Sequence, residues 1–452
     1  MTRIFARFLA VIAAFGMVAQ PAAAQSILRD AETEQLLQDM MDPLAEAAGL
    51  GAGSVEVVLI NDGSINAFVA GGQRVYIHSG LIGAADTANE VQGVLAHELG
   101  HITGGHILRF EEGIGNATKI TLLSLLVGIG AALAGSSDAA VGAMALGQQA
   151  AQRSFLSFSR AQESSADAAG AEYLSKAGIS GRGSLAFFGK LQNYEFRRGY
   201  SQSDEAGFAR THPLSGDRIA NLRADYEADP AWDTPSDPVL ERRFTQAKAK
   251  LFGYLSPPER TLQFYPENDQ TVPARYARAY AYHKDARLDM ALAETDALLL
   301  DDPDNAYFLE LRGQVLLESG KPLDALPNLR EATRISGHHP LIASTFAHAL
   351  IATEDEAYLP EAEQVLRAAV GRDRENPFAW YQLGIVYGRQ GDMPRARLAS
   401  AEFAILTGKP TEALSHAEYA EANLPYGTPD WIRAQDVALQ ARDQLERMRE
   451  RR

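Results

Sequence analysis

The spacing of hydrophobic residues divides the chain into a short mixed part and a long helical part. Apolar side chains at helical intervals predict a helix over residues 30–50, which Pro43 kinks or divides. Short runs rich in β-branched and aromatic residues then predict strands over residues 54–61, 64–70 and 74–78. The last strand is a candidate sheet edge, where main-chain groups could hold an extended peptide.

A hydrophobic helix is predicted directly after these strands, with Asp86 or Thr87 as its N-cap. It contains His97-Glu98-Leu99-Gly100-His101. Histidines four residues apart lie on one helix face, so His97 and His101 can bind one metal ion, and zinc suits neutral imidazoles. Glu98 can act on a water as general base. The alternative is a surface helix with two solvated histidines, but the apolar residues at helical spacing just before them indicate a buried helix.

An apolar hairpin is predicted after this helix. Residues 120–134 are apolar throughout but number only 15, fewer than the roughly 20 that span a bilayer. Small residues over 139–151 form the second arm. We favour a buried hairpin that covers the active site, and the alternative is a lid or a membrane-surface element formed by residues 120–151.

Further candidate site residues lie downstream. Glu163 is the candidate for a third ligand from outside the HExxH motif, and Asp167, four residues later on the same helix face, could accept the second N–H of a ligating histidine. By itself such a pair is more often a solvated helix face. His106 lies one position before the third histidine of an HExxHxxGxxH pattern, so it is not expected to be a ligand. His212 is either a loop residue or a hydrogen-bond donor to an oxyanion, and spacing does not decide between these roles.

The second half of the chain is a helical repeat. A stretch rich in proline and acidic residues, 227–237, predicts a domain boundary, and residues 238–255 predict a helix. Four alanines then recur at spacings of 34, 37 and 34 residues: Ala291, Ala325, Ala362 and Ala396. Residues 380–387 match the W-x2-L-G-x2-Y pattern of the tetratricopeptide repeat. We expect four helix pairs, with the residues from Thr411 onward as a cap.

Composition and charge narrow the possible functions. The 452 residues include no cysteine, which excludes disulfides, thiolate metal sites and a cysteine nucleophile. A net charge of -16 counts against nucleic acid as a partner. Arg3 and Arg7, the apolar residues 8–18 and Ala22-Ala23-Ala24 predict a signal peptide cleaved after Ala24, with an uncleaved anchor as the alternative. We therefore expect an exported protein, periplasmic in a Gram-negative cell.

These motifs in this order resemble the periplasmic beta-barrel assembly-enhancing protease family, which is grouped with zinc metallopeptidases of the HtpX and CAAX prenyl protease type. The resemblance rests on the HELGH helix, the apolar hairpin, SRxxExxxD, THPLxxxR and the repeats. It implies that His97, His101 and Glu163 bind zinc, Glu98 is the base and Asp167 supports a ligand. It further implies that His212 lies near the metal, where it gates access or stabilises the oxyanion, while Arg160 matches a family arginine of uncertain role. The family member that we compare carries cysteines near its C-terminus, whereas this chain has none.

The fold expected from the sequence is mainly α. An α+β zinc metallopeptidase domain with a small sheet (25–226) follows the signal peptide (1–24), and a linker with a connecting helix (227–272) leads to a solenoid of tetratricopeptide repeats (273–452). The predicted function is a periplasmic zinc endopeptidase that degrades misfolded or stalled outer-membrane proteins. Its repeats would dock substrate or the barrel-assembly machinery. The alternative is a chaperone or assembly factor that acts mainly through the repeats.

Overall fold

The computed structural model describes residues 26–106, 109, 115, 118–127, 137–198, 212 and 216–450. The predicted signal peptide lies outside these residues. The chain forms two compact units. Unit 1 comprises residues 34–245 and the residues before 30, while unit 2 comprises residues 246–452 together with 30–33. The division falls inside the helix α10 (Pro238–Leu255), after the stretch in which the sequence predicts the boundary.

Unit 1 contains a four-stranded sheet in the order β1-β2-β4-β3. The strands are β1 (Ser26–Ile27), β2 (Glu56–Asn61), β3 (Ala67–Val69) and β4 (Arg74–His78). Strand β4 pairs in parallel with β2 and antiparallel with β3. The prediction that this last strand forms an edge is therefore wrong, because β2 and β3 take up its hydrogen-bonding groups on both sides. Burial agrees, since Val75 and Ile77 of β4 have no exposed surface.

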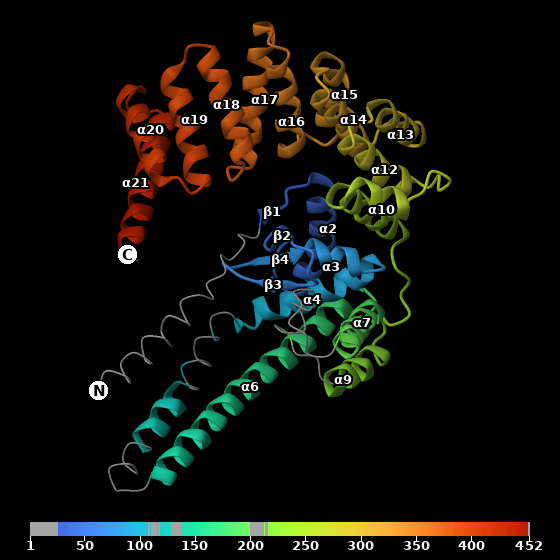
Figure 1. The fold of residues 1–452 in the computed structure, drawn as a ribbon, viewed down its shortest axis with the longest axis vertical. Coiled ribbons are helices and arrows are strands. Elements are labelled where there is room, and N and C mark those ends of the chain that lie inside the picture. The colour runs from blue at the N-terminus through green and yellow to red at the C-terminus, as the bar shows by residue number, and fades with distance from the viewer. Residues whose placement is uncertain are drawn as a thin grey trace, which may run out of the picture. The chain divides into compact units, whose positions relative to one another are not determined.

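Some helices of unit 1 pack against the sheet, and others extend away from it (Figure 1). Their bounds are α2 (Ala31–Ala47), α3 (Ser79–Ala84), α4 (Ala88–Thr103), α6 (Ser137–Lys176), α7 (Arg182–Arg198) and α9 (Gly216–Glu227). Helix α2 continues through Pro43 without a break. Helix α4 begins at Thr87, whose side chain accepts a hydrogen bond from the Glu90 amide. Every residue of α4 from Ala88 to His101 is buried, so this helix forms the centre of unit 1.

The predicted hairpin is helical in its described parts, residues 118–127 and the first half of α6. Figure 1 shows these helices side by side, and Gly147 lies against the Ser124 side chain. The prediction of a buried hairpin is wrong, because Leu122, Leu123 and Leu126 are 55%, 64% and 66% exposed. Ile120 and Ser124 are the less exposed positions from residue 120 to 127, and Ser124 faces Gly147 of α6, so the leucines lie on the sides of the helix that no described residue covers. Among the described residues, no helix combines the length and apolarity that crossing a membrane requires.

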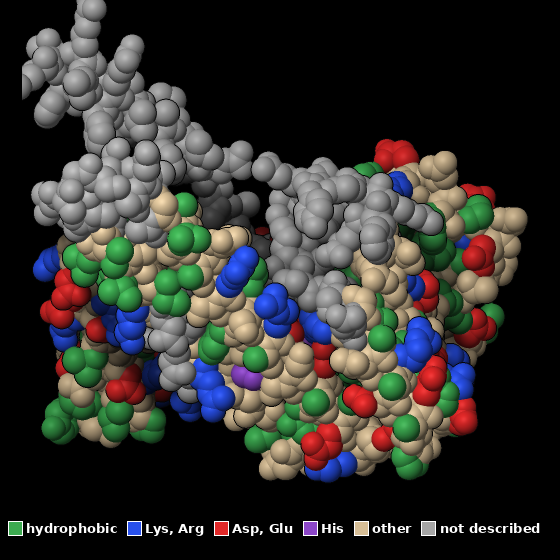
Figure 2. Space-filling model, turned by 90° about the horizontal axis from the view of Figure 1, so that it is seen from below, with side chains coloured by type: hydrophobic (Ala, Val, Ile, Leu, Met, Phe, Trp, Pro, Cys, Tyr) green, Lys and Arg blue, Asp and Glu red, His purple; other side chains and the backbone are tan. Residues whose placement is uncertain are grey.

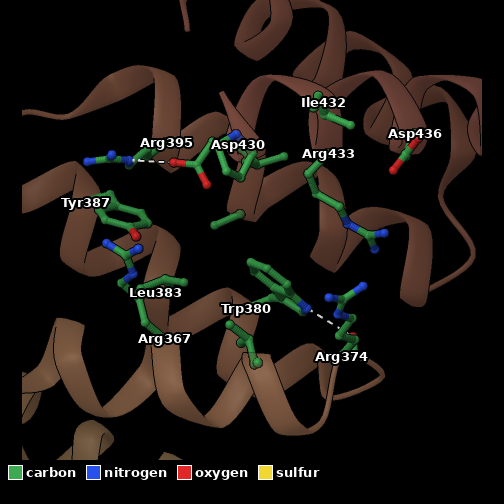
Figure 3. A pocket seen from close by; sticks show the side chains of 15 residues that line it. Arg367, Arg374, Trp380, Leu383, Tyr387, Arg395, Asp430, Ile432, Arg433 and Asp436 are labelled. Carbon is green, nitrogen blue, oxygen red and sulfur yellow. Dashed lines mark hydrogen bonds and ion pairs between the residues drawn. The ribbon is translucent and has the colours of Figure 1, made fainter. Parts of the chain in front are cut away.

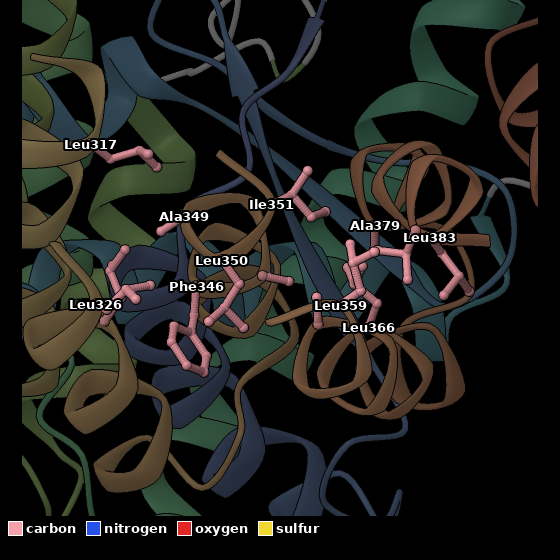
Figure 4. Packing of buried hydrophobic residues seen from close by; sticks show 14 of the residues in the cluster. Leu317, Leu326, Phe346, Ala349, Leu350, Ile351, Leu359, Leu366, Ala379 and Leu383 are labelled. Carbon is pink, nitrogen blue, oxygen red and sulfur yellow. The ribbon is translucent and has the colours of Figure 1, made fainter. Parts of the chain in front are cut away.

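Unit 2 is built of antiparallel helix pairs. The helices are α11 (Pro258–Phe264), α12 (Val272–Lys284), α13 (Leu288–Asp301), α14 (Ala306–Glu318), α15 (Pro322–Ile335), α16 (Pro340–Ala352), α17 (Leu359–Arg372), α18 (Pro377–Arg389), α19 (Met393–Leu406), α20 (Pro410–Asn423) and α21 (Pro429–Glu450). The recurring alanines are buried, which allows paired helices to approach closely. Figure 4 shows Phe346, Leu350 and Leu366 packed between successive helices. These features agree with the predicted tetratricopeptide solenoid.

A short N-terminal segment, residues 30–33, completes unit 2. Asp30 Oδ2 lies 2.5 Å from Lys250 Nζ, and Glu32 Oε2 lies 3.3 Å from the same atom. The Tyr276 hydroxyl donates a hydrogen bond of 2.7 Å to Glu32. Lys250 is buried, and its pKa is raised well above the usual value because the attraction of Asp30 outweighs the effect of burial. The charge of Lys250 is thus neutralised by residues that lie far from it in the sequence, at positions 30 and 32.

Candidate metal centre

Small residues bring helices α4 and α6 into backbone contact at the centre of unit 1. A Cβ atom at Gly100 would lie 2.6 Å from the Ala166 carbonyl oxygen, and one at Gly170 would lie 3.0 Å from the Ala96 carbonyl oxygen. Neither position has room for a larger side chain. This close approach places the α6 carboxylates of Glu163 and Asp167 against the α4 histidines.

Four side chains converge at this contact: His97, His101, Glu163 and His212. Each offers one donor atom, and these atoms lie within 4.8 Å of one another. His97 Nε2 is 3.2 Å from His101 Nε2 and 3.5 Å from Glu163 Oε2. His212 Nδ1 is 3.1 Å from Glu163 Oε1, so the structure brings this residue, whose role spacing left undecided, into the same group. Zinc in proteins binds imidazole nitrogens and carboxylate oxygens. The three histidines and the glutamate of this group are donors of these kinds, so the site fits a zinc ion.

Asp167 and Arg218 support the two ligands that they contact. Asp167 Oδ1 lies 3.0 Å from His97 Nδ1, which leaves His97 Nε2 to face the other ligands. Arg218 donates hydrogen bonds of 2.7 and 2.8 Å to the two Asp167 oxygens, and its Nη1 lies 3.1 Å from Glu163 Oε2. The side chains of Asp167, Arg218 and Glu163 are all buried. A carboxylate that holds the second nitrogen of a ligating histidine fixes the tautomer and orientation of its ring.

His106 gives His101 a corresponding partner. Gly105 has φ +61°, which ends α4 and returns the chain toward it, and a Cβ atom at Gly104 would strike the His106 ring. The His106 Nδ1 and His101 Nδ1 atoms are 2.9 Å apart. A metal on His101 Nε2 leaves the proton on its Nδ1, so that nitrogen donates and His106 accepts. His106 is therefore placed to position a ligand, and it lies outside the ligand group itself.

We expect His106→Ala to weaken metal binding about 10–100-fold, because the His101 ring would lose the acceptor that orients it. Competition with a chelator gives the dissociation constant, and the visible spectrum of the cobalt-substituted protein reports the ligand geometry. His106→Gln retains an acceptor oxygen and should restore part of the affinity. Wild-type affinity and spectrum in the alanine variant would rule out the positioning role.

Glu98 faces the same group but differs from the ligands in its contacts. It is 0% exposed, and neither carboxylate oxygen has a hydrogen-bond partner in the described part of the chain. His212 Nε2 lies 3.4 Å from Glu98 Oε1. Burial raises the pKa of Glu98 above its usual value. A buried carboxylate without a donor fits a position where a water molecule is to be bound and deprotonated.

Burial and neighbouring charges separate the pKa values of the metal-free cluster. Burial acts to lower the pKa of His97, but Asp167 and Glu163 outweigh it and raise that pKa to about 10. Burial and the neighbouring His97 lower the pKa of His101 to about 2. Burial acts to raise the pKa of Glu163, but hydrogen bonds from His212 and His97 hold it well below its usual value. A metal ion must therefore displace a proton from this cluster, which makes metal binding weaker at low pH.

Two supporting residues, His106 and Arg218, were given no supporting role from the sequence alone. His106 carried a usable signal, the two glycines that precede it. Arg218 is the arginine of the THPLxxxR motif, but the motif does not indicate its contacts with Asp167 and Glu163. Arg160, in contrast, is exposed in the structure.

The comparisons with known proteins agree with this geometry. A sequence model of Peptidase family M48 matches residues 31–225. A protein named Protease HtpX homolog, from Janthinobacterium sp. (strain Marseille), is 32% identical over 216 residues, which are 42% of this chain and 72% of that protein. The chain belongs to peptidase family M48. The M48 match spans the α4 and α6 residues of the candidate metal centre.

Other relatives of this M48 peptidase extend across the repeats as well. The Beta-barrel assembly-enhancing protease of Yersinia pestis is 26% identical over 431 residues, which cover 92% of this chain and 85% of that protein. The protein of the same name from Escherichia coli (strain K12) is 26% identical over 403 residues, or 87% of this chain and 79% of its own length. The likeness to these relatives therefore includes the helical unit 2.

Proposed function

We propose that this M48 peptidase is a zinc-dependent endopeptidase of the periplasm that cleaves misfolded or stalled outer-membrane proteins. The observation that carries the proposal is the buried group of His97, His101, Glu163 and His212 beside the buried Glu98 carboxylate, which has no hydrogen-bond partner among the described residues. The M48 match supports peptide-bond hydrolysis. The long relatives are named for beta-barrel assembly, which supports a role of this chain in the assembly of such proteins, and the predicted signal peptide supports export.

The residues of the site have separate tasks in this reaction. His97, His101 and Glu163 would hold the zinc ion, and Asp167 and His106 orient the two histidines. A bound zinc ion supplies a Lewis acid, which lowers the pKa of water toward about 7 and polarises a peptide carbonyl. Glu98 takes the proton from the attacking water and passes it to the nitrogen of the leaving amine. Because Glu98 is fully buried, bulk water does not compete for its proton.

The position of His212 bears on whether the resting enzyme is held inactive. Catalytic zinc sites use three protein ligands and keep the next position for water. His212 Nδ1 lies 3.3 Å from His97 Nε2, close enough to occupy that position. We therefore propose that His212 restrains the resting enzyme and that its ring must move before water enters. Because His212 also lies beside the base Glu98 at 3.4 Å, we propose a second role for it as a hydrogen-bond donor to the oxyanion.

The repeats and the hairpin supply two surfaces for partners. Tetratricopeptide solenoids bind peptides and proteins along their helices, so unit 2 would dock substrate or the barrel-assembly machinery. The exposed leucines of residues 118–127 suit contact with a membrane surface, since they form an apolar face on a helix that bears only Lys119 as a charged residue. Figure 2 shows one face of the molecule, where hydrophobic side chains lie exposed among charged ones.

The alternative function, a chaperone or assembly factor that acts mainly through the repeats, is favoured by the size of unit 2, which takes up residues 246–452. Complementation of an outer-membrane assembly defect separates the two. Full rescue by Glu98→Gln favours the chaperone, whereas rescue only by the wild type favours the peptidase.

A time course on an unfolded outer-membrane protein tests the proposed function. We expect the mature wild-type chain to cleave it, and we expect a chelator to stop the cleavage because the attacking water then loses its activation. Addition of zinc should restore the activity, whereas addition of magnesium should not. Cleavage that continues without metal would contradict a zinc peptidase. Absence of cleavage with zinc bound would direct the next experiment to His212→Ala, which should release a latent enzyme but not a chaperone.

A further inference from the structure

Unit 2 contains a pocket of about 480 Å³ that has no part in the proposed catalysis (Figure 3). It is bounded by α17, α18, α19 and the first turns of α21. Its volume lies within the range of roughly 300–1,000 Å³ that is usual for ligand pockets. The terminal helix α21 contributes Asp430, Ile432 and Arg433, so the pocket exists only because the cap packs against the repeats.

One part of the pocket wall is apolar. Leu383 and Leu398 are buried at its wall, and Ile432 and Trp380 add partly exposed hydrophobic surface. The Trp380 Nε1 donates a hydrogen bond of 3.0 Å to the Arg374 carbonyl oxygen, which fixes the orientation of the indole. In Figure 3 the indole lies between the side chains of Arg367 and Arg374. A large apolar side chain could enter here and stack on the indole.

Four arginines line the same pocket together with Asp430 and Asp436, and the arginines differ in their partners. Arg395 Nε lies 2.8 Å from Asp430, and Arg433 Nη2 donates a hydrogen bond of 2.8 Å to the buried Glu402. These two guanidinium groups are neutralised within the protein. The charges of the other two, Arg367 and Arg374, are less compensated by neighbouring carboxylates.

Arg374 has no carboxylate partner among the described residues and is exposed at the pocket. Arg367 Nη1 lies 3.5 Å from Glu363, which is a long contact between partly solvated groups and contributes little. The pocket therefore presents two available guanidinium groups beside an apolar wall. Guanidinium binds carboxylates through paired hydrogen bonds, which makes an arginine more selective for them than a lysine.

We propose that this pocket binds the free C-terminus of an extended peptide whose last residue carries a large apolar side chain. The C-terminal residue bears its carboxylate and its side chain on one Cα atom, so both can enter a single pocket. Inside an extended chain, an acidic residue and its apolar neighbour point to opposite faces and cannot both do so. The combination of guanidinium groups and apolar wall therefore favours a chain end over an internal acidic residue.

The inference rests on the docking role proposed for the repeats and gives that role a specific ligand. It is tested by binding alone, with the mature Glu98→Gln chain so that the probe is not cut. The probe is a short fluorescent peptide that ends in Phe-Phe with a free carboxylate, and the measurement is fluorescence anisotropy. Matched peptides carry a C-terminal amide, a C-terminal Gly, or an internal Asp with an amidated end.

We expect the free-acid Phe peptide to bind at least roughly tenfold more tightly than its amide, because the amide lacks the charge that the guanidinium groups recognise. Arg374→Glu and the double variant with Arg367→Glu should remove this difference. Arg374→Lys should retain part of it, since a lysine keeps the charge but loses the paired hydrogen bonds. Arg447→Glu, an exposed change elsewhere on α21, is the control and should bind as the parent does.

Equal binding of acid and amide, or preference for the internal Asp peptide, would overturn the proposal. Unchanged binding by a folded Arg374→Glu chain would do the same, and circular dichroism establishes that the variant is folded. A result that contradicts the proposed peptide pocket can be told apart from a result that contradicts the proposed peptidase activity. Loss of the acid preference leaves zinc-dependent cleavage of unfolded protein intact, whereas a chain without peptidase activity can still show the acid preference.

Discussion

Glu98→Gln is expected to reduce the rate of peptide cleavage by about 10²–10⁴-fold while leaving metal binding unchanged. The glutamine side chain has the same shape but cannot accept the proton of the attacking water. Glu98 lies outside the ligand group, so its substitution leaves the donors of the metal centre in place. The measurement is kcat on an unstructured peptide, together with the metal content of each purified chain.

The matched control for this experiment is Glu172→Gln, an exposed position on α6 that pairs with Lys176. This variant should cleave at the wild-type rate. If Glu98→Gln retains wild-type activity, another group must deprotonate the water. If it loses its metal as well as its activity, Glu98 is a ligand and the assignment of the base is wrong.

Arg218→Met is expected to lower the free energy of unfolding by about 3–5 kcal/mol, because it leaves the buried Asp167 carboxylate without its cation. Burial acts to raise the pKa of Asp167, but His97 and Arg218 lower it below its usual value. The stability that this carboxylate provides is therefore present above its unfolded pKa and disappears as the pH falls through the folded value. Removing Arg218 should move that loss of stability to higher pH.

Chemical denaturation of the metal-free chain at several pH values measures this effect. Arg223→Met, on the same helix but 56% exposed with a single contact of 3.6 Å to Glu227, should change stability little. The double variant Arg218→Met/Asp167→Asn should regain part of the stability, since no unpaired charge remains, but it should bind metal less tightly than the wild type. Equal stability of Arg218→Met and the wild type would mean that solvent, and not Arg218, neutralises Asp167.

The sequence was most informative where function depends on spacing along one helix. His97, Glu98 and His101 are brought together by the geometry of α4 alone, and Glu163 and Asp167 share a face of α6 for the same reason. The repeat also followed from local rules, because its alanines and aromatic residues recur at the positions where paired helices touch. Such features do not require knowledge of distant parts of the chain.

Features that depend on distant segments were less accessible from the sequence. The sequence predicts an edge position for strand β4, because its pairing with both β2 and β3 depends on the order of strands in the sheet, which no local pattern indicates. The exposure of Leu122 and Leu126 could not be seen in their composition, since an apolar helix has the same sequence whether or not a surface covers it. The contacts of Arg218 with Glu163 and Asp167 likewise span about fifty residues.

The four residues 30–33 limit how this protein can be divided. A fragment that starts at residue 246 contains every helix of the repeats but lacks Asp30 and Glu32, which neutralise the buried Lys250. The repeats therefore cannot be separated from the peptidase as an intact domain by truncating the chain at one position. Gene fusion or recombination that exchanges repeat arrays between proteins must carry the N-terminal segment as well, or replace Lys250 with an uncharged residue. The segment 30–33 and the repeats must therefore be inherited together, although residues 34–245 of the peptidase unit separate them in the sequence.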